Sequence, residues 1–298
     1  MDTAGTSPVR LRADYRKIAE LYGDTRSPER IIAHYLVERR LADALRASTK
    51  AERENGAYNR LYDTLLTEVY DHPRWTASHE PSGDYADRQV RMLLGELKPE
   101  DVFLDIGGGD CRIALSVAPY VAKSIVVDVS DQLVPRDITA TNFEFVKNRC
   151  ADVPVPDESV SFIYSNQVLE HIHPDDVEER MRELYRVLKP GGRYMCRTPN
   201  RFSGPHDVSM YFDDVSHGTH MREYSYETLY RLVGDAGFVH PRIMIAPRAY
   251  RLFDLPYALA RLVERVFAAA PRSLHTPICR SHIGRSLLGI TMMVEKPL

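Results

Sequence analysis

The sequence has few cysteines, and their placement excludes two kinds of small scaffold. Among its 298 residues are four, none of them in a CxxC pair: Cys111, Cys150, Cys196 and Cys279. A zinc knuckle needs closely spaced thiols, and a disulfide-stabilised domain is usually shorter and richer in cysteine. We therefore expect free thiols in a reducing compartment, which favours a cytoplasmic protein.

Long apolar runs and a strong excess of charge are also missing. No stretch approaches 18 uninterrupted apolar residues, so no membrane-spanning helix is expected. The opening residues MDTAGTSPVR lack the apolar core of a secretory signal. The formal net charge is only −3, so a polyanion such as duplex DNA is not an expected partner. What remains is an ordinary globular composition, 44% hydrophobic and 27% charged.

The first 80 residues predict helices and little strand. Ser27 and Pro28 form a typical helix start, and Thr49 and Glu52 have the spacing of a capping box at the start of the next helix. Two prolines and a glycine in DHPRWTASHEPSGD then predict a linker. We interpret residues 1–80 as a helical cap. Its aromatic stripe either lines a substrate pocket or serves ordinary helix packing; the residues are Tyr58, Tyr62, Tyr70 and Trp75.

Strand-like and helix-like segments alternate over residues 81–298. This alternation predicts an α/β fold, in which helices cover both faces of a mostly parallel sheet. A short helix is expected between the strands near residues 124–130 and 143–146. A helical insert at about 250–280 precedes the last strand. Its apolar face is either core, a pocket wall or a homodimer surface, and consists of Leu255, Leu259, Leu262, Val263 and Val266.

An apolar segment ends in three consecutive glycines in VFLDIGGGDCRIAL, residues 102–115. Glycines at the end of a first parallel strand let a ligand approach the backbone, next to the free N–H groups of the following helix. Gly107 and Gly109 fit the first positions of G-x-G-x-x-G, but Arg112 stands at the third. Asp128 follows about 20 residues on, where a carboxylate binds ribose hydroxyls. From these residues alone, the site could bind either a dinucleotide or another nucleoside cofactor.

Later segments resemble the class I S-adenosylmethionine (SAM)-dependent methyltransferases. CADVPVPDESVSFIYSNQVLEHI and MRELYRVLKPGGRY are similar, in order and spacing, to the family's D-x-x-L-P-F-P-D-x-S-F-D, L-E-H and L-K-P-G-G motifs. The resemblance covers residues 100 to about 240. It implies a Rossmann-like sheet of seven strands with helices on both faces, SAM as the cofactor, and methyl transfer as the activity.

The resemblance also implies which residues hold SAM. The motif that contacts the methionine part corresponds to Asp105, Gly107, Gly108 and Gly109. Asp128 matches the acid that binds both ribose hydroxyls, with Val129 and Ser130 beside the adenine. Asp152 and Val153 correspond to the pair near the adenine amino group, although the usual place of that acid is taken by Arg149. Asn166 and Gln167 end the fourth strand, where the family lines the methyl-donor pocket.

Histidines and acids gather after the fourth and fifth predicted strands. A hydroxyl acceptor needs a general base or a metal ion. His171 and His220 are the candidate bases, with His206 and His217 as alternatives. The pattern is similar to E-x-x-E-H…H of the ubiquinone-pathway O-methyltransferases and the small-RNA 2′-O-methyltransferases, which implies a divalent ion such as Mg²⁺ on Glu170, His171 and His220. Gln167 replaces the first carboxylate of that pattern, which removes a charge that a hard cation would use.

Together these patterns predict a SAM-dependent methyltransferase that acts on a small molecule. The expected acceptor is an oxygen of a secondary metabolite or of a sugar-bearing intermediate, because arginine-rich additions for nucleic acid are missing. N- or C-methylation and a SAM-binding partner protein without activity are the alternatives. An NAD-dependent oxidoreductase is disfavoured by Arg112 and the later motifs. No nucleic acid or membrane partner is expected, and a homodimer is left open.

Overall fold

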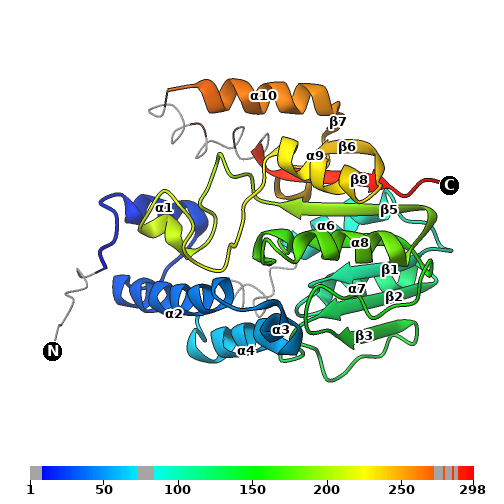
Figure 1. The fold of residues 1–298 in the computed structure, drawn as a ribbon, viewed down its shortest axis with the longest axis horizontal. Coiled ribbons are helices and arrows are strands. Elements are labelled where there is room, and N and C mark those ends of the chain that lie inside the picture. Colours follow the sequence, from blue (N-terminus) through cyan, green and yellow to red (C-terminus); the bar gives the residue numbers. More distant parts are fainter. Residues whose placement is uncertain (1–8, 73–83, 272–277, 279–283, 285–287) are drawn as a thin grey trace.

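The computed structural model describes residues 9–72, 84–271, 278, 284 and 288–298. Its centre is an eight-stranded sheet in the order β3-β2-β1-β4-β5-β8-β6-β7 (Figure 1). The strands are β1 (Val102–Ile106), β2 (Lys123–Asp128), β3 (Phe143–Lys147), β4 (Val160–Asn166), β5 (Leu188–Thr198), β6 (Val239–Ile245), β7 (Phe253–Leu255) and β8 (Ile290–Glu295).

The first five strands pair in parallel, and β8 is antiparallel to both β5 and β6. The expected mostly parallel, Rossmann-like sheet is therefore confirmed. The short strand β7 extends the expected seven strands by one, antiparallel to β6 at the edge. The short helix expected after β2 is wrong, because residues 129–142 form turns and bends. Pro135 and the β-branched residues Ile138, Thr139 and Thr141 disfavour a helix there.

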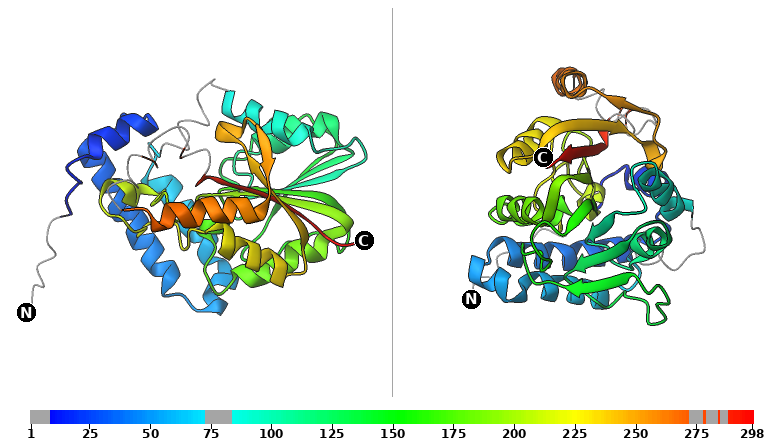
Figure 2. Two further views of the ribbon diagram at one scale, coloured as in Figure 1. Left: turned by 90° about the horizontal axis from the view of Figure 1, so that it is seen from above. Right: turned by 90° about the vertical axis from the view of Figure 1, so that its right-hand side faces the viewer.

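Helices cover both faces of the sheet (Figure 2). On one face, α8 (Val177–Val187), α9 (Tyr226–Asp235) and α10 (Tyr257–Ala269) contribute Met181, Leu229 and Ala260 to the larger core. On the other face, α6 (Asp84–Leu94) and α7 (Arg112–Val117) contribute Leu93 and Val117 to a second core. No helix among the described residues is long and apolar enough to cross a bilayer.

The N-terminal helices described before residue 73 lie at the end to which the parallel strands point (Figure 1). They are α1 (Tyr15–Tyr22), α2 (Pro28–Arg46), α3 (Lys50–Glu52) and α4 (Tyr58–Glu68). Ser27 caps α2 through its contact with the N–H of Arg30, and the Thr49–Glu52 capping box is confirmed. The helix expected after this box is broken, because Gly56 takes a φ of 86° that turns the chain between α3 and α4.

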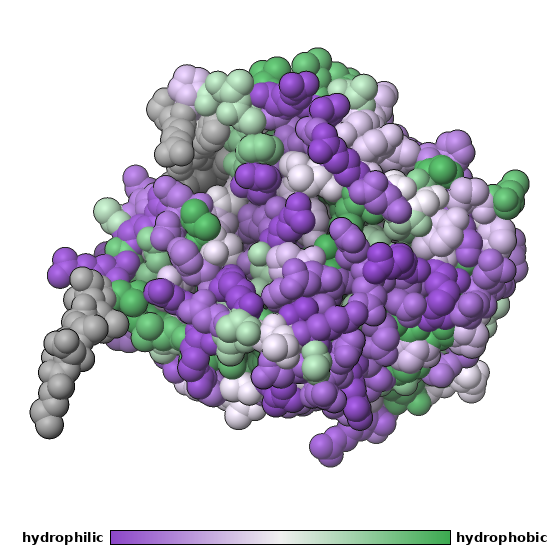
Figure 3. Space-filling view, in the orientation of Figure 1, coloured by the Kyte–Doolittle hydropathy of each residue, from purple (hydrophilic) through white to green (hydrophobic). Residues whose placement is uncertain are grey.

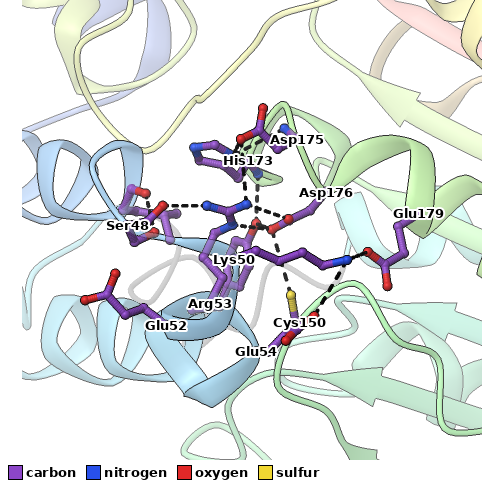
Figure 4. Close-up of polar contacts among 12 residues, drawn as sticks. Ser48, Lys50, Glu52, Arg53, Glu54, Cys150, His173, Asp175, Asp176 and Glu179 are labelled. Atoms are coloured by element: carbon purple, nitrogen blue, oxygen red, sulfur yellow. Dashed lines mark hydrogen bonds and ion pairs between the residues drawn. The ribbon is translucent and has the colours of Figure 1, made fainter.

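A buried ion pair fastens these helices to the sheet domain (Figure 4). Arg53 Nε and Nη2 donate to the two carboxylate oxygens of Asp176, at the start of α8, over 2.7 and 2.8 Å. Tyr58 donates its hydroxyl to the same carboxylate, and the Tyr58 oxygen accepts from the N–H of His173. Burial alone would raise the pKa of Asp176, but the hydrogen bonds from Arg53 and Tyr58 lower it. Both partners of the pair are buried, so each depends on the other for its polar contacts.

Helix α10 exposes much of its apolar face, whereas a surface helix usually packs that face against the core. In Figure 3 hydrophobic surface gathers along the upper edge of the molecule, where Figure 1 shows α10. Of the three alternatives for its apolar face, burial in the core does not apply to Leu259, Leu262 and Val266, which are exposed, while Leu255 and Val263 are half-buried. Glu264 points inward instead, where its carboxylate accepts hydrogen bonds from Asn200 Nδ2 (2.7 Å) and from the N–H of Tyr226 (2.8 Å). Tyr226 is the first residue of α9, so this carboxylate satisfies one of that helix's unpaired N–H groups. The side of α10 that carries Glu264 therefore faces inward, and the side that carries Leu259, Leu262 and Val266 faces outward.

We predict that Asp176→Asn destabilises the protein by about 3–5 kcal/mol, because it leaves the buried Arg53 without its counter-charge. Urea unfolding followed by circular dichroism measures the change. Glu179→Gln is the matched control: Glu179 pairs with Lys50 in the same region over 2.8 Å, but both side chains are exposed, so the loss should stay within about 1 kcal/mol. Equal losses in the two variants would contradict a structural role for the buried pair.

Candidate functional site

A cavity of about 570 Å³ opens at the carboxyl ends of β1, β2 and β4. Ligands of open parallel sheets bind at this edge, and the volume is in the range of small-molecule sites. The cavity lining includes most of the residues expected to hold SAM: Asp105, Gly107, Gly108, Gly109, Asp128, Val129, Asn166 and Gln167. These residues come from three strand ends, and only the fold brings them together.

The three glycines are needed for different steric reasons. A side chain on Gly107 would meet Val168 at 2.6 Å, and one on Gly108 would meet Val126 at 2.8 Å. Gly109 has open space at its Cβ position but a φ of 52°, which other residues rarely adopt. Its N–H donates to Asp128 Oδ2 over 2.8 Å. The turn therefore brings bare backbone against the cavity wall and fixes the carboxylate of Asp128.

The carboxylates of Asp105 and Asp128, at this turn, have fewer hydrogen-bond donors in the described part of the protein than they can accept. Burial, followed by the charges of Asp128 and Asp110, raises the pKa of Asp105, whose Oδ2 is buried without a hydrogen-bond partner. Burial also raises the pKa of Asp128, and the N–H groups of Ser130 and Gly109 offset part of this rise. A carboxylate has about four acceptor positions, so these two bonds leave room for further donors. A ligand that brings an ammonium group and hydroxyls fits both acids.

The two residues expected near the adenine do not line the cavity, although their neighbours in the sequence do. Neither Asp152 nor Val153 is among the lining residues, whereas Asn148, Cys150 and Ala151 are. Asp152 is exposed and turns its carboxylate to the N–H of Cys150 (3.2 Å). In the sequence, Arg149 stands where the family's motif has an acid, and this mismatch was the only sign of the difference. Arg180 of α8 also lines the cavity and holds the backbone carbonyls of Cys150 and Asp152.

Helix α4 supplies one wall of the cavity. Tyr58, Tyr62 and Leu66 line it, which places part of the expected aromatic stripe at the site. Tyr70 is 70% exposed and does not take part, while Trp75 lies outside the described residues. Because Tyr58 also donates a hydrogen bond to Asp176, the Arg53–Asp176 pair that holds the N-terminal helices in place also positions this wall of the cavity.

A cluster of Glu170, His171 and His220 adjoins the cavity, which His171 lines. One ligand atom from each residue lies within 4.8 Å of the others. The His171 and His220 rings meet edge to face with centroids 4.7 Å apart. Glu170 is fully buried, and its Oε2 accepts a hydrogen bond from the hydroxyl of Thr198, at the end of β5, over 3.0 Å. The two segments that the sequence singled out, after β4 and after β5, therefore meet in space.

Hydrogen bonds fix the tautomers of both histidines. His171 Nδ1 lies 3.1 Å from the carbonyl of Thr219, which can only accept, so this nitrogen carries the proton. His220 Nδ1 donates to Glu223 Oε1 over 2.8 Å. Burial opposes a charge on His220, but the bond to Glu223 and the charge of Glu170 raise its pKa. In both neutral rings the lone pair is thus on Nε2, the arrangement of a base or a metal ligand.

The reserve histidines lie outside this cluster. His206 Nε2 bonds to Ser203 Oγ over 2.9 Å, and burial lowers its pKa. His217 is 41% exposed and pairs with Asp213. Sequence reasoning missed Glu223, which binds His220 and also accepts from the N–H of His206 (2.8 Å). Its position three residues after His220 was the only signal.

The cap also fixes the loop that carries His220. Glu38 of α2 accepts the hydroxyl of Thr219, and Arg46 Nη2 donates to the carbonyl of Gly218 over 2.8 Å. Burial, followed by the charge of Asp207, raises the pKa of Glu38 to about 7. Through Thr219, whose carbonyl accepts from His171, helix α2 is connected to the histidine cluster.

A second group with ligand-type atoms, His34, Glu38 and His72, is a poor metal site. Arg26 Nη1 donates to His34 Nδ1 over 2.8 Å, so the proton of the neutral ring is on Nε2, the nitrogen that faces Glu38. Burial and the charge of Arg26 lower the pKa of His34 to about 3. This group is best explained as a polar contact within the cap.

Comparison with known proteins agrees with this geometry. Residues 78–240 match the family described as Methyltransferase domain. The chain is 32% identical over 115 residues to the uncharacterized methyltransferase YcgJ of Bacillus subtilis, covering 37% of this chain and 45% of that protein. It is 32% identical over 160 residues to a probable S-adenosylmethionine-dependent methyltransferase of Mycobacterium tuberculosis, covering 52% and 56%. The chain thus spans about half the length of these curated relatives.

A solved structure has the same fold. Phosphoethanolamine N-methyltransferase 1 of Haemonchus contortus, in complex with phosphoethanolamine and S-adenosylhomocysteine, superposes with a TM-score of 0.54. The identity is 13%, over 81% of this chain and 50% of that one, so the likeness concerns the fold alone. Because the family match extends over more than half of the 298 residues and includes both the glycine turn and His220, the chain belongs to the methyltransferase domain family.

Proposed function

We propose that this protein transfers the methyl group of SAM to an oxygen of a small molecule. One observation carries the proposal: a cavity with two under-satisfied carboxylates at one end adjoins two histidines whose Nδ1 atoms are already bonded. The carboxylates fit the ammonium and the ribose hydroxyls of SAM. The histidines fit the removal of a proton from an acceptor hydroxyl.

The residues would divide the work as follows. Asp128 binds the ribose, Asp105 faces the methionine ammonium, and Asn166 and Gln167 lie beside the methyl donor. Bound SAM would supply an electrophilic methyl group, which would pass to the acceptor oxygen and leave S-adenosylhomocysteine (SAH) and a methyl ether. Nε2 of His171 or His220 would accept the hydroxyl proton. Alignment of the two reactants is worth up to about 7–11 kcal/mol, so the walls of the cavity contribute as much as the base.

The histidine cluster also fits a divalent cation. Two imidazole nitrogens and the carboxylate of Glu170 would hold it, and both rings are oriented by a bond from Nδ1, as metal-binding histidines usually are. When bound, such an ion would lower the pKa of an acceptor hydroxyl. Imidazole suits zinc, iron or nickel, whereas Mg²⁺ prefers oxygen ligands. With Gln167 in place of a carboxylate, we expect a transition metal rather than Mg²⁺.

The cap restricts the size of the acceptor. Tyr58, Tyr62 and Leu66 line one side of the cavity, and Glu38 holds the loop that carries His220. A cavity of about 570 Å³ supports a small acceptor, and the polar cluster supports a hydroxylated one, such as a secondary metabolite or a sugar-bearing intermediate. Product analysis distinguishes this from N- or C-methylation and from a SAM-binding partner protein without turnover.

We predict that Asp128→Ala weakens SAH binding at least about 10-fold, because each hydrogen bond to a charged group contributes about 1.5–3 kcal/mol. Isothermal titration calorimetry on the pure protein measures the affinity. Asp131→Ala is the control, since Asp131 is exposed, pairs with Lys147 and is close to Asp128 in sequence. Wild-type affinity in the Asp128 variant would remove the carboxylate from the cofactor site.

We predict that His171→Ala or His220→Ala lowers kcat by about 10²–10⁴-fold, as expected for loss of a general base, while SAH affinity is kept. SAH release is measured with an acceptor found by screening hydroxylated compounds for a methylated mass. His217→Ala, at an exposed histidine outside the cluster, should keep full turnover. Activity that survives chelation identifies a metal-free base, and loss restored by added metal identifies a metal site. Full turnover in both cluster variants would refute either role.

We predict that Glu223→Gln moves the acidic limb of the kcat–pH profile to lower pH. A base must be neutral, so turnover falls as the pH drops below the pKa of His220. The bond to Glu223 raises that pKa, and an uncharged glutamine removes most of the effect. A purely structural role for Glu223 would lower kcat at every pH and leave the limb in place.

A further inference from the structure

Two buried polar atoms of the cavity lining have no hydrogen-bond partner among the described residues. They are Oδ1 of Asn148, which follows β3, and Nε of Arg180, on α8. The two side chains are only 3% and 5% exposed, and both line the cavity. One atom is an acceptor and the other a donor. Because leaving such groups unbonded in a buried place costs free energy, we expect a ligand to supply the missing partners.

A single turn of the chain orients both side chains. Asn148 Nδ2 donates to the carbonyls of Cys150 and Asp152, each over 3.0 Å. Carbonyls can only accept, so the nitrogen of this amide faces the turn and Oδ1 faces away from it. Arg180 holds the same two carbonyls through Nη2 and Nη1, which leaves Nε over. The shared turn therefore brings the unpartnered acceptor and the unpartnered donor to one region of the cavity.

This region adjoins the carboxylate proposed to bind the ribose. The N–H of Asn148 donates to the carbonyl of Asp128 over 2.9 Å, across the ends of β3 and β2. Burial raises the pKa of Asp128, and the positive charge of Arg180 is among the influences that offset this rise, so the guanidinium is also near. In a nucleoside the base is attached to the carbon next to the one that carries the 2′-hydroxyl. A base on a ribose held by Asp128 would therefore lie within reach of both side chains.

We propose that Asn148 and Arg180 recognise the adenine of SAM by its edge, with the amino group donating to Asn148 Oδ1 and a neighbouring ring nitrogen accepting from Arg180 Nε. Adenine presents a donor beside an acceptor, which is complementary to this pair. Arg149, which stands where the family's motif has an acid, is exposed and is not among the lining residues. The proposal rests on SAM binding, as the proposed function does, but not on the acceptor or on the histidines.

Calorimetry with SAH and S-inosylhomocysteine tests the proposal on the unaltered protein. In the inosine compound a carbonyl oxygen replaces the amino group, and the adjacent ring nitrogen carries a proton. An oxygen then faces Asn148 Oδ1 and an N–H faces Arg180 Nε. We expect SAH to bind at least about 100-fold more tightly, because two hydrogen bonds are lost and each is worth about 10-fold. Equal affinities for the two compounds would overturn the proposal and leave SAM binding intact.

Variants of the turn then assign the preference to a residue. Asn148→Leu removes the acceptor, so SAH should bind about 10-fold more weakly and its advantage over the inosine compound should fall by at least about 10-fold. Arg149→Ala is the matched control: this exposed neighbour should keep both the affinity and the preference. Loss of the preference in Arg149→Ala, or full preference in Asn148→Leu, would contradict the proposal.

A further variant separates recognition from a structural role of the turn. Asn148→Asp keeps an acceptor oxygen but loses the amide donors to Cys150 and Asp152, so it should keep the preference for SAH even if the fold is less stable. This variant also serves if Asn148→Leu does not fold, as judged by circular dichroism. A merely structural Asn148 predicts that SAH and the inosine compound weaken equally in every variant, with an unchanged ratio. Failure of the wild type to bind SAH at all would instead contradict SAM as the cofactor.

Discussion

The candidate site depends on two carboxylates that lie beside the glycine turn. Asp105 and Asp128 lie at the ends of neighbouring strands, and burial raises the pKa of both. The protein supplies Asp128 with two backbone N–H groups and leaves Asp105 Oδ2 without a donor. Such an arrangement is unfavourable for an empty fold and favourable for one that binds a cationic, hydroxyl-bearing ligand. The presence of these two acids at the turn is thus better explained by ligand binding than by a contribution to the stability of the fold.

The helical cap connects this end of the cavity to the other. Arg53 and Tyr58 meet at Asp176, and Tyr58 at the same time lines the cavity. Glu38 and Arg46 hold the loop that contains Thr219 and His220. The cap therefore does more than cover the sheet: it positions the wall of the cavity that contains Tyr58 and the loop that carries His220. Since several of these contacts are buried and charged, they define one arrangement of the cap rather than a loose cover.

A second consequence of buried polar anchoring appears at α10. Glu264 faces inward to serve the start of α9, and the apolar residues that would usually be core face outward. The same principle, that a buried carboxylate needs hydrogen-bond donors, thus applies to the attachment of the cap at Asp176 and to the inward face of α10 at Glu264.

The sequence by itself determined the alternation of strands and helices, the glycine turn, Asp128 and the two histidine-bearing segments, because strand ends, turns and motifs are local patterns. It did not determine that Asp152 turns away from the cavity, that Glu223 supports His220, or that Glu264 rather than Leu262 is buried. Those outcomes depend on contacts between residues far apart in the chain, such as Glu264 with Asn200. Hydrophobic periodicity cannot anticipate them, because it does not show which polar side chain will find hydrogen-bond partners elsewhere in the chain.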